Sequence, residues 1–136
     1  MGRHELREQV FKLLFRVEFN SPEEMPEQVK LFFEDGEPSY EERDAEYITD
    51  KFHKIQEKIP QIDQLINEHT EGWDTARMGK VELTVLRIAA YEILWDEEIP
   101  AGVAIDEAVR IAKTYGQESS GGFVNAILAK FVKPGE

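Results

Sequence analysis

Three histidines are the residues of this chain best suited to metal or proton chemistry, and their spacing supports neither. His4, His53 and His69 lie far apart, and none belongs to a metal-binding pattern such as HExxH. Cysteine is absent, which excludes a thiol nucleophile, a cysteine zinc site and an iron–sulfur cluster. The sequence also lacks a phosphate-binding loop and a Gly-x-Ser-x-Gly nucleophile elbow. We therefore expect no catalysis, no metal site and no cofactor.

Basic side chains near the N-terminus are suited to binding phosphate. Arg3 and Arg7 are four residues apart and share one face of a helix, and His4 stands next to Arg3. Arginine and lysine dominate contacts to a phosphate backbone, so this face could lie along RNA. The alternative is an ordinary solvated surface, which residue chemistry alone favours.

The start of the last expected helix is a second candidate binding place. The stretch from Ser119 to Gly122 offers backbone N–H groups at a helix N-terminus, which favours an anion. Phe123 can stack on a base, and Asn125 can hydrogen-bond to a base edge. The alternative is that Phe123 belongs to the core and that Ser119 or Ser120 only caps the helix. Composition does not decide between the two.

The elements that must position these residues are all helices, because apolar residues recur at steps of three and four without strand alternation. Pro60 suits the first turn of a new helix, and Gly116 suits a left-handed cap at a helix end. The segment 79–96 is apolar on most sides, which predicts a central helix. The expected helices are 2–19, 26–35, 39–59 (capped by Ser39), 60–69, 79–96, 102–115 and about 120–131. The predicted fold is all-α, a compact bundle of about seven helices.

Length and charge set the frame for these elements. The chain has 136 residues, which fits a single domain, and a formal net charge of −12. Residues 1–16 carry a net charge of +2, residues 17–57 of −9 and residues 58–136 of −5. At physiological salt the Debye length is about 8 Å, so a basic helix can attract phosphate beside a distant acidic face. The acidic block indicates a solvated face, or alternatively a surface that docks a basic partner.

Apolar runs in this sequence are short. No signal-peptide core is present near the N-terminus, and no segment is long enough to span a bilayer. We therefore expect a cytoplasmic protein that makes no membrane contact.

Three large side chains of the expected core have structural interpretations. Arg87 lies within an apolar run, so we expect it to form a structural ion pair, with Glu92 or Glu107 as candidate partners. Trp73 and Tyr91 are expected to belong to the core rather than to a stacking surface, since large aromatic residues dominate cores.

Four stretches of the chain form a distinctive combination across about residues 73–131. They are Trp73 with Arg77; Val85 to Leu94; Pro100 with Val103 to Val109 and Ala112-Lys113; and Phe123-Val124-Asn125 with Leu128. In order and spacing they resemble the family of the bacterial transcription antitermination factor NusB. The N-terminal helix matches that family more loosely, through Arg3, Arg7 and an apolar stripe that ends in Leu14-Phe15.

The resemblance implies a single NusB-like domain made of two small helical bundles packed side by side, at about 1–70 and 71–136, without catalysis. It implies pairing with the small-subunit ribosomal protein NusE on the boxA RNA of ribosomal RNA leader transcripts. There the pair helps the transcribing RNA polymerase resist termination. The RNA-binding residues that the resemblance implies are Arg3, His4, Arg7, Phe123 and Asn125. It also places Glu82 at the surface that meets RNA and NusE.

Departures from the family pattern bear on affinity. Glu5 stands where many relatives have a basic residue, and Gly122 leaves no basic side chain before Phe123; Leu6, Asp106 and Ala126 also differ. We therefore predict weak RNA binding by the chain alone and tighter binding with NusE.

Two other functions remain open as interpretations. One is a protein–protein module with an acidic docking face and little RNA binding of its own. The other is an accessory domain of a ribosomal RNA methyltransferase, which 136 residues disfavour because they leave no cofactor-binding domain. The sequence leaves self-association into a homodimer open.

Overall fold

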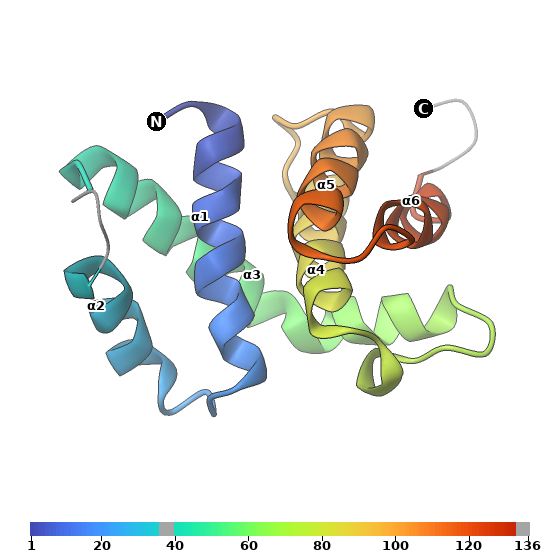
Figure 1. Cartoon of the computed structure of the whole chain (residues 1–136), viewed down its shortest axis with the longest axis horizontal. Coiled ribbons are helices and arrows are strands. Elements are labelled where there is room, and N and C mark those ends of the chain that lie inside the picture. Colours follow the sequence, from blue (N-terminus) through green and yellow to red (C-terminus); the bar gives the residue numbers. More distant parts are fainter. Residues whose placement is uncertain (36–39, 133–136) are drawn as a thin grey trace. The chain divides into compact units, whose positions relative to one another are not determined.

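Every regular element that the structure describes is helical (Figure 1). The computed structural model describes residues 1–35 and 40–132. The α-helices are α1 (Arg3–Phe15), α2 (Met25–Asp35), α3 (Glu42–Glu68), α4 (Lys80–Trp95), α5 (Ala101–Tyr115) and α6 (Ser120–Ala129), with 3₁₀ turns at Arg16–Glu18 and Thr75–Arg77. The all-α class is confirmed. Within the described residues there are six α-helices rather than about seven, and the expected cap Ser39 lies outside them.

The missing helix boundary is the one expected at Pro60. That proline lies inside α3, which continues to Glu68 without a break. A proline within a helix removes one backbone hydrogen bond and costs about 3 kcal/mol. The apolar stripe nevertheless continues past it, because Ile62 and Ile66 are fully buried. Burying each of these side chains contributes about 1.5–3 kcal/mol, which is enough to offset the cost of the proline.

The chain divides into two compact units, an N-terminal unit (Met1–Gln56) and a C-terminal unit (Glu57–Glu136). In the N-terminal unit, α1 and α2 and the first part of α3 supply a core of aliphatic and aromatic side chains. These are Val10, Phe11, Leu13, Leu14, Met25, Phe32, Ile48, Phe52 and Ile55. Their spacing of three and four along each helix is the amphipathic pattern read from the sequence.

In the C-terminal unit, α4 is the central helix, as predicted. All ten of its residues from Leu83 to Glu92 are buried. The helices α5 and α6 pack on α4 and on each other (Figure 1). A helix that is apolar on most sides is stable only when neighbours cover several of its faces, which explains this arrangement. No helix among the described residues combines the length and apolar character that crossing a bilayer requires.

Candidate functional site

The basic residues of α1 differ in how they are exposed. Arg3 is exposed in the first turn, and His4 is half-buried with its Nε2 atom 3.3 Å from Glu8 Oε1, one turn later. Arg7 is only 9% exposed. The spacing of four does put Arg3 and Arg7 on one helix face, but that face is buried at Arg7, in the second turn. Arg3 and His4 are therefore the accessible members of the group.

The start of α6 is arranged differently from the sequence expectation. Ser119 occupies the cap position, but its side chain makes no capping hydrogen bond. Ser120 is buried, and its hydroxyl accepts the backbone N–H of Gln117 at 2.9 Å and donates to the Glu82 carboxylate. A negative charge from the chain itself is thus tied to this helix start, where we expected an external anion.

Glu82 connects the first turns of two helices. It stands in the first turn of α4, three residues after the cap residue Gly79. Its carboxylate folds back over Gly79, where a Cβ atom would lie 2.4 Å from Glu82 Oε2. The same carboxylate accepts the Ser120 hydroxyl of α6. Glu82 therefore has a structural contact within the C-terminal unit, and its role toward a partner stays a prediction.

Gly116 ends α5 in extended backbone, with φ −102° and ψ −154°, so the expected left-handed cap is wrong. The glycine is needed for space instead. A Cβ atom at this position would lie 2.6 Å from Ser120 Oγ and 2.8 Å from the carbonyl oxygen of Ala112. Close approach of α6 to the end of α5 explains why a residue without a side chain stands here.

The rings of Trp73 and Phe123 and the guanidinium group of Arg77 form a cluster near the start of α6, the helix that contains Phe123. The half-buried Phe123 ring meets Trp73 edge to face, with centroids 5.8 Å apart and planes at 77°. The Arg77 guanidinium carbon lies 6.0 Å from the Trp73 ring centroid. Trp73 is 50% exposed, so its expected place in the core is wrong, whereas Tyr91 is buried as expected. The resemblance already singled out Trp73 and Arg77 as a pair four residues apart, and that spacing was the available signal for this cluster.

Asn125 does not join this cluster. It is exposed and lies two residues after Phe123 on α6, which turns its side chain by about 200° around the helix. The structure therefore places the two residues on different faces of α6. A contact of Asn125 with RNA stays a prediction.

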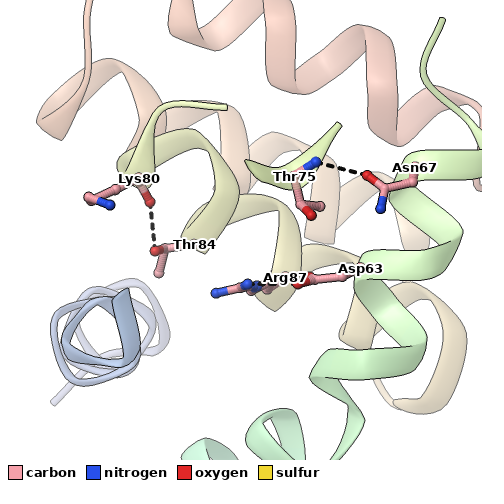
Figure 2. Close-up of polar contacts among 6 residues, drawn as sticks. All are labelled: Asp63, Asn67, Thr75, Lys80, Thr84 and Arg87. Atoms are coloured by element: carbon pink, nitrogen blue, oxygen red, sulfur yellow. Dashed lines mark hydrogen bonds and ion pairs between the residues drawn. The ribbon is translucent and has the colours of Figure 1, made fainter. Parts of the chain in front are cut away.

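Arg87 forms the structural ion pair that the apolar run indicated, with a partner that the sequence did not single out. Its Nε atom lies 2.9 Å from Asp63 Oδ1, and its Nη2 atom lies 2.7 Å from Asp63 Oδ2 (Figure 2). Paired contacts of this kind fix both distance and orientation. The pair joins α3 to α4 within the C-terminal unit. Arg87 itself is 6% exposed, which suits a structural role better than a ligand contact.

The predicted site residues are divided between the two units. Arg3, His4 and Arg7 belong to the N-terminal unit, and the remaining three, Glu82, Phe123 and Asn125, belong to the C-terminal unit. Within the described ranges, no group of three or more histidine or acidic side chains is placed to hold a metal ion.

Comparison with known proteins finds matches along nearly the whole chain. A family model described as the NusB family matches residues 4–133. The protein named transcription antitermination protein NusB in Lachnoclostridium phytofermentans is 47% identical to this chain, over 97% of this chain and 99% of the relative. The protein of the same name in Agathobacter rectalis is 48% identical, over 96% of this chain and 99% of the relative.

Solved structures give the same result. NusB of T. maritima superimposes with a TM-score of 0.85 at 38% identity, covering 98% of this chain and 92% of that one. A structure described as antitermination factors NusB and NusE in complex with dsRNA superimposes with a TM-score of 0.81 at 26% identity, covering 96% of this chain and 97% of that one.

Proposed function

Because the chain belongs to the NusB family, we propose that it is an RNA-binding transcription antitermination factor that pairs with the ribosomal protein NusE on boxA RNA of ribosomal RNA leader transcripts. The observation that carries the proposal is the full-length structural likeness to a NusB solved with NusE and RNA. The role needs no catalytic step and no cofactor. It places the protein in the cytoplasm, beside the transcribing RNA polymerase.

On this proposal the residues of α1 contact the phosphate backbone. Arg3 is exposed and His4 is half-exposed, so both can reach a phosphate without rearrangement of the helix. Arg7 lies one turn further along and supports the same face from a buried position. Contacts of this kind position the RNA but carry no sequence information.

The residues of the C-terminal unit supply contacts of another kind. The Phe123 ring can stack on an unpaired base, which is worth about 1–3 kcal/mol in single-stranded RNA complexes. Asn125 offers a side-chain amide from another face of α6, and Glu82 offers a carboxylate to the basic partner. NusE would add positive charge to a chain whose net charge is −12.

The proposal is tested by measuring RNA affinity against salt concentration, with and without NusE, for boxA RNA and for a scrambled RNA of equal length. We expect weak binding alone, tighter binding with NusE and a preference for boxA. Equal affinity for the two RNAs would contradict specific recognition, and an affinity that NusE leaves unchanged would contradict the cooperative pairing.

A second candidate function is a protein–protein module that docks a basic partner through acidic side chains. It is favoured by the net charge of −9 over residues 17–57, nearly all of which lie in the N-terminal unit. In the experiment above, salt-sensitive binding of NusE without measurable binding of any RNA would support this function over the first.

A further inference from the structure

Trp73 presents a large apolar ring to solvent from a loop that is held in place. The residue is 50% exposed, although a tryptophan gains more than most residues from burial. The Thr70 hydroxyl donates a hydrogen bond to the Trp73 carbonyl oxygen at 2.7 Å, within the loop. The Thr75 backbone N–H donates to Asn67 Oδ1 at 2.8 Å and ties the loop to the end of α3 (Figure 2). An exposed ring on a braced loop loses little conformational freedom when a ligand binds.

The two rings of the cluster define where a flat ligand can lie. The planes of Trp73 and Phe123 meet at 77°, so the edge of one ring contacts the face of the other. Trp73 is still 50% exposed, with the Arg77 guanidinium carbon 6.0 Å from its ring centroid. Two bases stacked on rings at this angle would not stack on each other. A bound strand would therefore turn between them, which single-stranded RNA can do and a base-paired helix cannot.

The charges of the segment around Trp73 allow a phosphate backbone to approach. Arg77 is exposed, and among the described residues its guanidinium makes no ion pair; Asp74 accepts the backbone N–H of Arg77 at 3.1 Å. Lys80 is also exposed. Over residues 69–80 two basic side chains balance two acidic ones, in a chain with a net charge of −12. The aromatic surface thus stands in a locally neutral segment with a cation at its edge.

We propose that Trp73 is a second base-stacking surface, adjoining Phe123, that takes an unpaired nucleobase of single-stranded RNA while Arg77 contacts a neighbouring phosphate. The inference rests on the proposed RNA-binding function and adds a subsite to it. Every base has a π-face, so this subsite accepts any of the four and contributes affinity rather than sequence preference. A ring with a cation beside it on a surface continuous with Phe123 favours a base over an apolar protein side chain, which would need no cation.

The first experiment compares variants of the full chain in complex with NusE, using boxA RNA as the probe. Trp73→Ala should weaken binding about tenfold and leave the salt dependence unchanged, whereas Trp73→Phe should keep most of the affinity. Arg77→Ala should lower the slope of log affinity against log salt by about 0.7, as expected for one phosphate contact to a single strand. Tyr47→Ala is the matched control, because Tyr47 is an aromatic residue of similar exposure (43%) on α3.

The second experiment locates the base by replacing single nucleotides of the probe with abasic ones. We expect one position at which the abasic change weakens binding to the wild-type chain but not to Trp73→Ala, as a double-mutant cycle requires for direct contact. Thermal unfolding of each variant confirms that the fold is kept. Unchanged RNA affinity of Trp73→Ala, or a loss confined to NusE affinity measured without RNA, would overturn the inference. If instead the wild-type chain bound no RNA while NusE bound normally, the proposed function itself would fail.

Discussion

Arg3 of the N-terminal unit and the pair Glu82 and Phe123 of the C-terminal unit are held in different ways. In the N-terminal unit, Arg3 is exposed in the first turn of α1, and its proposed role rests on charge. In the C-terminal unit, Glu82 is tied to Ser120 and Phe123 to Trp73, so candidate binding residues are also packing residues. Binding through α1 should therefore depend strongly on salt and weakly on folding. Binding through the C-terminal unit should be linked to stability.

The largest effect that would sharpen this contrast is expected at Arg87. Arg87→Ala leaves the largely buried Asp63 carboxylate without its bidentate partner, which should lower the free energy of unfolding by about 3 kcal/mol. Urea denaturation measures this. Lys54→Ala removes an exposed ion pair of similar length, 2.9 Å to Asp50, and should change the free energy of unfolding by less than about 0.5 kcal/mol. An equal loss of unfolding free energy in the two variants would contradict the distinction between the buried ion pair of Arg87 and the exposed ion pair of Lys54.

A smaller effect is expected at the start of α6. Ser120→Ala removes the partner of both the Gln117 N–H and the Glu82 carboxylate, and should lower the free energy of unfolding by about 2 kcal/mol. Ser119→Ala is the matched control, because Ser119 is exposed and makes no capping bond. It should stay within about 0.5 kcal/mol in the same denaturation assay. The reverse order would mean that Ser119 caps the helix after all.

The N-terminal side of the contrast is tested by charge reversal. Arg3→Glu should reduce affinity for boxA RNA severalfold and lower the salt slope by about one, with unfolding unchanged. Lys54→Glu makes the same change of charge at another exposed position of the N-terminal unit and should have little effect. Titration of labelled RNA at several salt concentrations measures both. If the two variants lost affinity equally, net charge rather than the position of Arg3 would govern binding.

The smallest effect concerns Glu24, before α2. The Ser21 backbone N–H donates to Glu24 Oε1 at 2.8 Å and lowers the pKa of that carboxyl group. A lowered pKa in the folded state means that this contact stabilises the turn above the ordinary glutamate pKa and is lost as pH falls through the lowered value. Side-chain NMR titration should show the lowered midpoint. A midpoint at the ordinary glutamate value would show that the hydrogen bond is not held in solution.

Local periodicity predicted most helices and the central place of α4, because each signal lies within a few residues of the element that it describes. What periodicity could not show depends on neighbours distant in sequence. The pairing of Arg87 with Asp63 joins residues 24 apart. Arg7 is only 9% exposed, although arginine is mostly found at the surface. Trp73 was misplaced because its size favours a core, while its position in a braced loop keeps it at the surface. Pro60 was read as a boundary because the cost of a proline is local, whereas the burial that offsets it is not.

Helix α3 limits how the chain can be cut into fragments. The division between the units falls between Gln56 and Glu57, within this one helix. Separate fragments would each hold a half-helix whose new end exposes about four unpaired backbone groups, at a length that is marginal in water. In the second fragment Pro60 would fall in the first turn, where its missing N–H removes no helical hydrogen bond. In a split form of this protein, the C-terminal end of the first fragment would therefore lose the most helical structure. Reassembly of the two fragments would have to rebuild a continuous helix.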